Sequence, residues 1–350
     1  MSSWRVRGIL LPCGDPVDGS VTAEGHWASA PAVDAEPLPG GFVLAGLVDA
    51  HCHLSVGPGP VALGLEEARA NLAALAATGV TVVRDTGSPR SVTLGLVADG
   101  EGARLMACGR FLAPAGQYFP ALHDPVPAEA LVEAALAEVG AGASWVKLVA
   151  DFPRLDRAGS REHLPTYPIP VIAELVAAVH QAGARVAAHT TTAYAKQLVA
   201  AGIDSVEHGD GLDEDDLAAL AGRGGAWTPT LCATIGPRPD EDDERRERRL
   251  RRRERLRRLL VVADRLGVTI LAGSDIVGTI PREVALLTEL GLSPQAALAA
   301  AGTAARSFLG VGGLADGRPA DLVTYHHDPR TDPETLARPA AVVAGGLRIR

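Results

Sequence analysis

The amino-acid sequence predicts an α/β protein, a (β/α)8 TIM barrel that carries a small β-sandwich module. Eight apolar segments of strand character alternate with Ala- and Leu-rich segments of helical period, which is the count of such a barrel. The linkers between them are short enough for parallel connections. Turn-rich, β-prone pieces stand at both chain ends. We therefore expect a barrel over residues 45–311 and one β module built from residues 1–44 and 312–350.

The eight expected strands follow one another between residues 42 and 275. They are the segments 42–49, 80–87, 104–112, 144–152, 185–192, 204–211, 226–231 and 268–275. A doubly wound open sheet uses the same strand–helix units, but it more typically carries a glycine-rich phosphate loop after its first strand. The sequence has no such loop there, which favours the barrel.

Composition and charge restrict the expected partners. With 47% hydrophobic and 21% charged residues, the 350-residue chain has a globular composition and can bury a large core. A formal net charge of −9 argues against nucleic acid or an anionic membrane, so we expect a small-molecule substrate and leave a homo-oligomer open. No segment reaches about 18 apolar residues, and the run before Cys13 is too short for a signal peptide. The four cysteines show no C-x-x-C spacing, so we expect reduced thiols and a cytoplasmic location.

Two histidines end the first expected strand, in GLVDAHCHL. His51 and His53 are two residues apart, which is the period of a strand, so both imidazoles leave the same face. At the carboxyl end of a barrel strand this face is the barrel mouth, where such folds keep their chemistry. A His-x-His pair alone is more often incidental than a metal site, so the interpretation depends on partners elsewhere.

Further polar side chains stand in later strands. His189, His208 and Asp275 end strands, and Lys147 lies inside the fourth strand. All of them fall on the same rim as the first histidine pair. A single strand-end histidine is usually structural, but four histidines and an acid at one end indicate a metal site.

Lys147 is one of only two lysines among 33 basic residues, and it stands inside the apolar stretch WVKLVA. Burying an ammonium there is costly unless the amine is neutralised or paired. A primary amine can react with carbon dioxide to form a carbamate, whereas a guanidinium cannot. The two carbamate oxygens could bridge two cations. The alternative is a snorkelling or ion-paired lysine.

An arginine-rich segment places ten arginines between Arg245 and Arg258. Its apolar positions keep the i, i+3, i+4, i+7 spacing of a helix: Leu256, Leu259, Leu260 and Ala263. Acidic residues 241–244 suit a helix amino end, so we expect a solvated barrel helix. A nucleic-acid or acidic-partner role is the weaker alternative because the whole chain is negative. His326 and His327 lie in a C-terminal turn and are expected at the surface.

GLVDAHCH, WVKL, AAHT, VEHG and AGSD, in this order, resemble the metal-binding motifs of the amidohydrolase superfamily. The resemblance is to its binuclear branch, near the imidazolonepropionase-like and metal-dependent Xaa-dipeptidase (prolidase-like) enzymes. RDTG at 84–87, TAARSFLG at 303–310 and GRPADLV at 317–323 are also similar to segments of these proteins, so the resemblance covers nearly the whole chain.

The resemblance implies two divalent metal ions. Zinc is the default for a histidine-rich site with a carboxylate bridge, although manganese, cobalt or iron could use the same ligands. The implied ligands are His51 and His53 on one metal, His189 and His208 on the other, Lys147 modified to a bridging carbamate by carbon dioxide, and Asp275 as ligand and proton shuttle.

The loop after the third strand departs from the resemblance. Dipeptidase-like relatives usually carry a Gly-Gly-His element there, whereas this chain reads LAPAGQYFPALHD. Tyr118 and His123 are the candidates for substrate contact in this loop.

We expect a metal-dependent hydrolase that cleaves the amide bond of a dipeptide or an N-acyl amino acid with a metal-bridging hydroxide. Asp275 would take the proton of the hydroxide and deliver it to the departing nitrogen, and His208, or a loop histidine such as His123, could help to polarise the carbonyl. The alternative role of Asp275 is a simple ligand or a helix cap. Two other functions stay open: hydrolysis of a cyclic amide, lactone or other ester at the same site, and a non-catalytic scaffold protein. The complete ligand set disfavours the scaffold.

Overall fold

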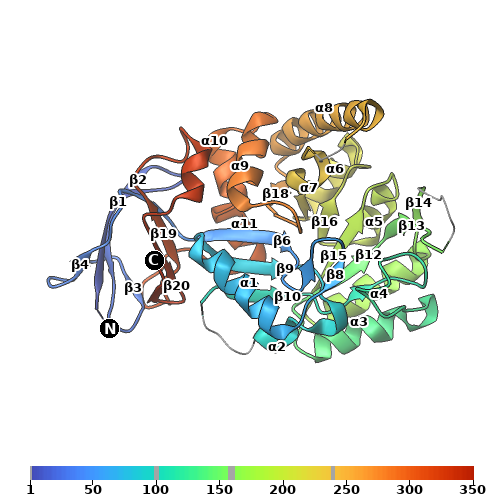
Figure 1. Ribbon diagram of the computed structural model, residues 1–350, viewed down its shortest axis with the longest axis horizontal. Helices are drawn as coiled ribbons and strands as arrows, with labels where there is room; N and C mark the ends of the chain where they lie inside the picture. The colour runs from blue at the N-terminus through green and yellow to red at the C-terminus, as the bar shows by residue number, and fades with distance from the viewer. Residues whose placement is uncertain (1, 98–101, 157–161, 238–240) are drawn as a thin grey trace.

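The computed structural model of the protein describes residues 2–97, 102–156, 162–237 and 241–350. The chain forms a larger part of parallel strands and helices and a smaller module of strands at one end. Both chain termini lie in the smaller module (Figure 1).

Two parallel sheets form the larger part. Their strand orders are β10-β9-β6 and β11-β12-β15-β16-β17-β18. The strand bounds are β6 (Leu47–Cys52), β9 (Val80–Asp85), β10 (Arg104–Ala107), β11 (Phe111–Leu112), β12 (Trp145–Val149), β15 (Arg185–Thr190), β16 (Ser205–His208), β17 (Ala226–Thr228) and β18 (Thr269–Ile270). Each of the eight expected segments overlaps at least one of these strands, and β6 runs three residues beyond the segment 42–49.

Three of the expected strands are divided. In the segment 42–49, Phe42–Leu44 form β5 of the smaller sheet and β6 begins only at Leu47, and the segment 144–152 holds β12 and the start of β13 (Asp151–Pro153), which joins a separate hairpin. The segment 104–112 was expected to form a single strand, but β10 pairs with β9 and β11 pairs with β12. Gly109 lies between the two halves with φ +70°, and a Cβ there would collide with Oε2 of Glu138. The chain turns at a position where glycine alone fits without strain, and each half then joins a different sheet.

Backbone hydrogen bonds join β6 to the segment that follows β18. The amide of Ala50 donates to the carbonyl oxygen of Ala272 (2.9 Å), and the amide of Asp275 donates to that of His51 (2.7 Å). The first and the last parallel strands therefore run side by side. The fold is TIM-barrel-like, and it brings the carboxyl ends of its strands to one rim.

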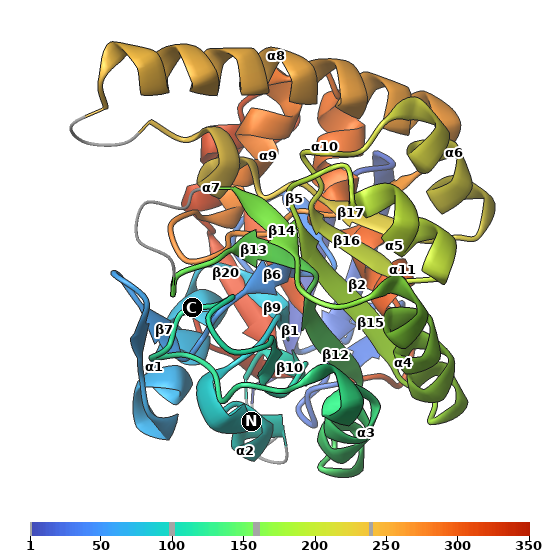
Figure 2. The same cartoon turned by 90° about the vertical axis from the view of Figure 1, so that its right-hand side faces the viewer.

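Helices surround the parallel strands (Figure 2). Their bounds are α1 (Leu65–Ala77), α2 (Leu94–Val97), α3 (Leu131–Gly140), α4 (Ile169–Gln181), α5 (Ala195–Ala201), α6 (Glu214–Gly222), α7 (Leu231–Ile235), α8 (Asp243–Leu266), α9 (Ile280–Glu289), α10 (Pro294–Ala300) and α11 (Thr303–Leu309). Helix α4 illustrates why they pack there, because one stripe at helical spacing is buried: Ile172, Leu175, Val176 and Val179. Among the described residues, no helix has the length and apolar character needed to cross a membrane.

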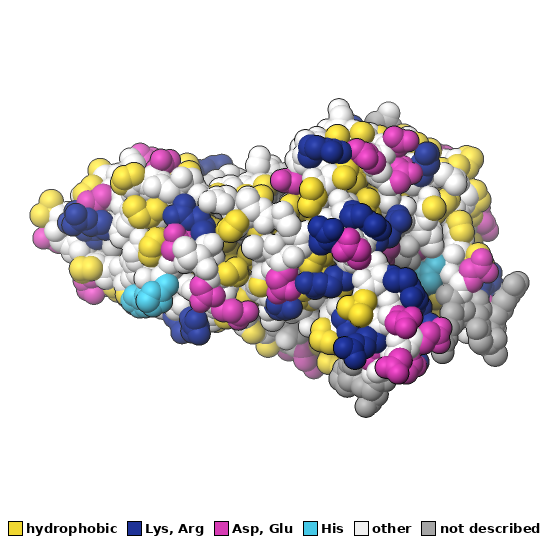
Figure 3. Space-filling model, turned by 90° about the horizontal axis from the view of Figure 1, so that it is seen from above, with side chains coloured by type: hydrophobic (Ala, Val, Ile, Leu, Met, Phe, Trp, Pro, Cys, Tyr) yellow, Lys and Arg dark blue, Asp and Glu magenta, His cyan; other side chains and the backbone are white. Residues whose placement is uncertain are grey.

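Helix α8 contains the arginine-rich segment. The Asp242 side chain caps its amino end by accepting a hydrogen bond from the amide of Arg245 (2.7 Å). Three of its four expected apolar positions are buried, and Leu259 is half-buried. Its arginines pair with acids, as Arg251 does with Glu247 (3.1 Å), and basic and acidic side chains lie side by side over this helix (Figure 3). The helix is solvated on its outer face, as the sequence predicts.

The smaller module is a sheet with strands from both chain ends. Its order is β21-β20-β19-β5-β1-β2-β3, and β4 pairs with β1. The bounds are β1 (Trp4–Leu10), β2 (Asp15–Val21), β3 (Trp27–Ala28), β4 (Glu36–Pro37), β5 (Phe42–Leu44), β19 (Leu322–Tyr325), β20 (Ala341–Ala344) and β21 (Leu347–Arg348). β19 pairs antiparallel with β5, with Val323 opposite Leu44, and this pairing joins the two ends. His326 and His327 are exposed, as expected.

Two short hairpins and three short 3-10 turns complete the described structure. The hairpins pair β7 (Val56–Gly57) with β8 (Val61–Ala62), and β13 (Asp151–Pro153) with β14 (His163–Pro165). The 3-10 turns span Pro89–Ser91, Ala128–Ala130 and Pro333–Ala337.

Candidate metal centre

The six expected metal ligands gather at one rim of the parallel strands. We call them the strand-end cluster: His51, His53, Lys147, His189, His208 and Asp275. A cavity of about 330 Å³ opens there, and every member of the cluster except His51 lines it. The His51 ring lies behind, with its centroid 5.2 Å from that of His53 and 5.1 Å from that of His208. The structure therefore brings together residues from β6 and the residue just after it, from β12, β15 and β16, and from the segment after β18.

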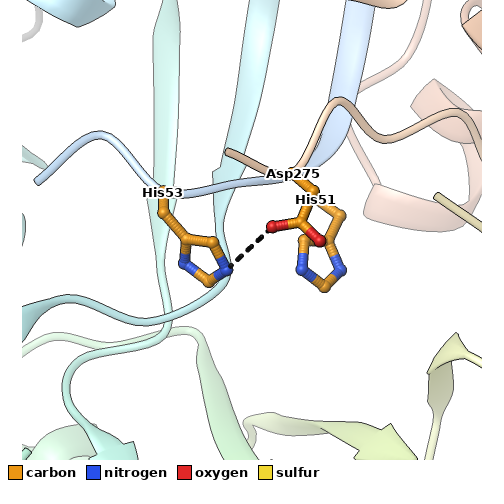
Figure 4. A group of neighbouring side chains, drawn as sticks. All are labelled: His51, His53 and Asp275. Carbon is orange, nitrogen blue, oxygen red and sulfur yellow. Dashed lines mark ion pairs between the residues drawn. The ribbon is translucent and has the colours of Figure 1, made fainter. Parts of the chain in front are cut away.

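His51, His53 and Asp275 form the first group in this cluster. Each offers one ligand atom within 4.8 Å of the others, a spacing that could hold a metal ion. Figure 4 shows the Asp275 carboxylate beside both imidazoles. The closer Asp275 oxygen lies 3.7 Å from Nε2 of His53.

His189 and His208 form the second group. Their ring centroids are 4.4 Å apart, and the second oxygen of Asp275 lies 4.0 Å from Nδ1 of His208. Asp275 therefore stands between the two groups.

Hydrogen bonds orient three of the four imidazoles. Nδ1 of His53 contacts the carbonyl oxygen of Gly87 (3.0 Å), and because a carbonyl only accepts, this nitrogen carries the proton. Nδ1 of His51 contacts the Glu207 carboxylate (2.6 Å), and Nδ1 of His208 contacts the Thr230 hydroxyl (2.7 Å). Such contacts leave the Nε2 lone pair free, as in the carboxylate–histidine–metal arrangement.

Several buried polar atoms of the cluster have no protein partner. Among the described residues these include Nε2 of His51, Nε2 of His189 and Nζ of Lys147. Buried polar atoms normally have hydrogen-bond partners, so three buried atoms without a partner at one rim fit a site that binds cations. The donor set of imidazoles and oxygens suits zinc or a similar divalent metal.

The protonation states of the cluster also fit a metal site. Burial lowers the pKa of His189 to about 3 and holds the pKa values of His51 and His208 well below their usual range, so these imidazoles are neutral at pH 7. Burial likewise lowers the pKa of Lys147, which favours the neutral amine that carbamate formation needs. Metal ligation requires the same neutral imidazoles.

Backbone strain coincides with the cluster. His208 and Asp275 have positive φ angles of +67° and +56°, and Thr230, which contacts His208, has +45°. Residues other than glycine seldom adopt this conformation, and where it occurs it is concentrated at functional sites. With these backbone angles, the side chains of His208, at the end of β16, and Asp275, in the segment after β18, line the cavity.

Two buried charged residues near the cluster were missed by the sequence reasoning. Glu207 binds His51 with one oxygen, and its other oxygen accepts a hydrogen bond from Nη2 of Arg84 (2.8 Å). The Arg84 guanidinium stacks over the Trp145 ring, 4.5 Å from its centroid. Both residues stand inside apolar strands, and this costly burial is the signal that could have identified them.

Asp49 was also missed. Its carboxylate accepts hydrogen bonds from the Ser274 hydroxyl (2.5 Å), the Ser274 amide (3.1 Å) and the His51 amide (3.2 Å). It thereby ties β6 to the segment that carries Asp275.

The two expected substrate-contact residues lie at different depths. Tyr118 lines the cavity, and its ring centroid is 4.9 Å from that of Phe111. His123 lies behind Tyr118, with ring centroids 5.6 Å apart, and Nδ1 of His123 contacts the carbonyl oxygen of Phe119 (3.0 Å). The contact of either residue with substrate stays a prediction.

Comparisons with known proteins identify the class of protein. The model of the Amidohydrolase family matches residues 42–347. Uncharacterized proteins of Mycobacterium bovis and Mycobacterium tuberculosis are 34% identical over 358 residues, which covers 98% of this chain and 94% of each relative. The chain therefore belongs to the amidohydrolase family.

Solved structures of similar fold include hydrolases. A putative prolidase from Bifidobacterium longum matches with a TM-score of 0.83 and 24% identity, covering 99% of this chain and 94% of that one. A Xaa-Pro dipeptidase with methionine bound in its active site matches with a TM-score of 0.80 and 20% identity over the full length of both chains. The protein is thus a hydrolytic enzyme of a family that generally uses metal ions and acts on small molecules, which sets the scaffold alternative aside.

Proposed function

We propose that this enzyme is a metal-dependent hydrolase that cleaves the amide bond of a dipeptide or an N-acyl amino acid. The observation that carries the proposal is the group of partnerless buried atoms in the strand-end cluster, on His51, His189 and Lys147. Burying a polar atom without a hydrogen-bond or metal partner costs free energy, so a bound ligand that supplies the partner is favoured. The names of the two similar solved structures, a prolidase and a dipeptidase, support an amide of the amino-acid type.

Two divalent cations would be held by the strand-end cluster, and zinc is the first to test. In this proposal His51, His53 and Asp275 hold one cation, and His189 and His208 hold the other. Lys147, modified to a carbamate by carbon dioxide, would be a ligand of both. When bound, such cations activate water as a nucleophile and polarise a substrate carbonyl.

Asp275 is the proposed proton carrier. Its amide is anchored on the carbonyl oxygen of His51 (2.7 Å), and its carboxylate lies between His53 and His208. From this position it can take a proton from the attacking water and deliver it to the departing nitrogen, which is too basic to leave as an anion. His208 is the second catalytic candidate, at the same rim, where it would help to orient and polarise the carbonyl.

The proposal includes the architecture around the site. Residues 45–311 would form one closed (β/α)8 barrel, supported by the hydrogen bonds between β6 and the segment after β18. Residues 1–44 and 312–350 would form a β-sandwich, supported by a separate apolar cluster that includes Val6, Trp27 and Leu322. A cytoplasmic location and a homo-oligomer remain predictions.

The direct test is a hydrolysis screen with the full-length chain. The protein is stripped of metal, reloaded with zinc, manganese or cobalt, and offered dipeptides, N-acyl amino acids, lactones and cyclic amides. We expect hydrolysis of an acyclic amide that appears on reloading, is lost in His189→Asn and is kept in His326→Asn, a matched change at an exposed histidine. Cleavage of lactones or cyclic amides alone would favour the alternative substrate class, and cleavage of none would contradict the proposal.

A further inference from the structure

The cavity has an aromatic side. We call Tyr118, Phe119 and Phe152 the aromatic wall, and all three line the cavity. The Phe152 ring centroid lies 5.1 Å from that of Tyr118, 5.2 Å from that of Phe119 and 5.8 Å from that of His189. Rings at these separations form a packed apolar surface that ends beside the strand-end cluster.

A cation from the arginine-rich helix lines another side of the same cavity. Arg252 of α8 stands there beside Thr234 of α7, the helix that follows β17. The aromatic wall belongs to β13 and to the loop after β11. In the six-stranded sheet, β15 and β16 lie between β12, which precedes Phe152 of the aromatic wall, and β17, which precedes Thr234. A molecule bound over the strand-end cluster can therefore contact the aromatic wall at one end and Arg252 at the other.

Arg252 is held in place by its neighbours. Nε donates to Oδ1 of Asp210 (2.7 Å), Nη2 pairs with Oδ2 of the same residue, and Nη1 donates to the carbonyl oxygen of Thr234 (3.3 Å). A guanidinium has five N–H groups, so these contacts with described residues leave one hydrogen on each Nη for a ligand. Its side chain keeps 36% of its surface exposed.

Arg252 differs from the more exposed paired arginines of α8 in that it lines the cavity at the strand-end cluster. Arg248 pairs with Glu244, Arg251 with Glu247, and Arg257 with Glu254, and these three arginine side chains are 47–67% exposed. Among the described residues that line the cavity, the lysine, the histidines and the acid all belong to the strand-end cluster. Of the described lining residues outside the cluster, Arg252 is therefore the one that carries a fixed positive charge.

We propose that Arg252 binds the carboxylate of the departing amino acid while the aromatic wall receives the acyl group, so that the preferred substrates are amino acids N-acylated by an apolar or aromatic acid. This inference rests on the proposed function and deepens it. A guanidinium matches a carboxylate geometrically through paired N–H groups, and rings favour flat apolar groups. Arg252 is a specificity-determining residue in this proposal, and the reacting carbonyl lies between it and the wall.

The test uses two probes that differ only at the carboxylate. N-benzoyl-L-phenylalanine and its carboxamide, N-benzoyl-L-phenylalaninamide, are offered to the zinc-reloaded full-length enzyme. A charge-assisted contact predicts that kcat/KM favours the acid by about 10- to 100-fold. Arg252→Gln should remove most of this preference by raising KM for the acid far more than KM for the carboxamide, with metal content unchanged.

Arg255→Gln is the matched control. Arg255 lies one turn further along α8 and donates to the carbonyl oxygens of Asp210 (2.9 Å) and Leu212 (2.8 Å), but it is not part of the cavity lining in the described structure. It should keep the wild-type preference. If Arg252→Gln acted only by loosening α8, both variants would lose activity on both probes alike.

Two results would overturn the inference while leaving the proposed function intact. One is equal kcat/KM for acid and carboxamide in the wild type, and the other is an unchanged preference in Arg252→Gln. If no amide is cleaved at all, the proposed function fails, and calorimetric binding of the two probes still decides the role of Arg252. Tighter binding of the acid that Arg252→Gln abolishes supports it, and equal binding of both probes refutes it.

Discussion

The floor and the wall of the cavity are held in different ways. The floor is the strand-end cluster, in which three of the four imidazoles are oriented by hydrogen bonds to groups on other strands and loops, such as the Glu207 carboxylate and the Gly87 carbonyl. By the wall we mean here both sides of the cavity: the aromatic wall, whose rings pack on one another, and Arg252, which is fixed by a partly exposed ion pair. The floor therefore keeps the ligand atoms in a fixed geometry. The wall offers the substrate an apolar surface and a positive charge.

This difference predicts which measurements each region controls. Changes in the floor should alter kcat and metal affinity, because ligand geometry and proton transfer depend on it. Changes in the wall should alter KM and substrate preference while the metals stay bound. A variant in the floor that changed substrate preference but neither kcat nor metal affinity would contradict this distinction.

Asp275→Asn should have the largest effect. The variant keeps the shape of the side chain and removes the base, so we expect kcat to fall by about 10² to 10⁴. Steady-state kinetics on an acyclic amide, with metal content measured on the same sample, checks this. Near wild-type turnover in an Asp275→Asn protein that carries full metal would refute the role of Asp275 as proton carrier.

Glu207→Gln should weaken metal binding by about 10- to 100-fold, the usual effect of losing the partner of a ligating histidine. The change removes the charge that orients His51 and that neutralises Arg84. Competition with a metal chelator gives the affinity. Glu289→Gln is the control, because this carboxylate pairs with Arg253 and Arg282 at the surface. Equal metal affinity in the two variants would contradict the orienting role.

The floor could be predicted from the sequence for a geometric reason. Parallel strands bring their carboxyl ends to one rim, so the position of a residue within a strand–helix unit is enough to group His51 with Asp275. The sheet shared by both chain ends could also be predicted, because turn-rich, β-prone segments stand at both ends of the sequence. The break at Gly109 could not be predicted, because it depends on contact with Glu138 from helix α3.

Most of the wall could not be predicted from the sequence, which singled out only Tyr118 among its residues. Arg252 is one of ten arginines in a segment whose pattern indicates a solvated helix. What distinguishes it is the ion pair with Asp210, which depends on how α8 packs against the loop after β16. Phe152 likewise gains its role from ring contacts with Tyr118 and His189, which come from other parts of the chain.

Acid should destabilise the metal-free floor. Burial lowers the pKa of His189 to about 3, from about 6.5 in the unfolded chain. Between these values the unfolded chain binds a proton that the folded protein does not, so the free energy of unfolding falls as the pH falls through this window. His189 contributes at most about 1.4 kcal/mol per pH unit to this slope.

Urea unfolding of the metal-free protein at pH 6.5 and at pH 4.5 measures this slope. His189→Gln cannot titrate and should show a shallower slope than the wild type, whereas His326→Gln, at the surface of the terminal module, should match the wild type. Identical slopes in all three proteins would show that His189 is not held neutral.

Phe152→Leu should have the smallest effect. The substitution keeps an apolar side chain but removes a ring from the aromatic wall, so KM for an N-benzoyl amino acid should rise by about 3- to 10-fold. kcat, metal content and KM for an N-acetyl amino acid should stay close to wild type. A matched loss on both substrates would mean that Phe152 supports the fold or His189 rather than the acyl group.

The metal content of wild type and Lys147→Met measures the central claim most directly. Lys147 has a buried amine without a partner among the described residues, and the account makes it the bridge between two cations. Full-length protein loaded with zinc in bicarbonate buffer is dialysed and analysed by mass spectrometry for metal per chain. We predict two zinc ions in the wild type and at most one in Lys147→Met, with partial recovery on adding a short carboxylic acid. Two zinc ions retained by Lys147→Met without added acid, or none bound by the wild type, would contradict the account.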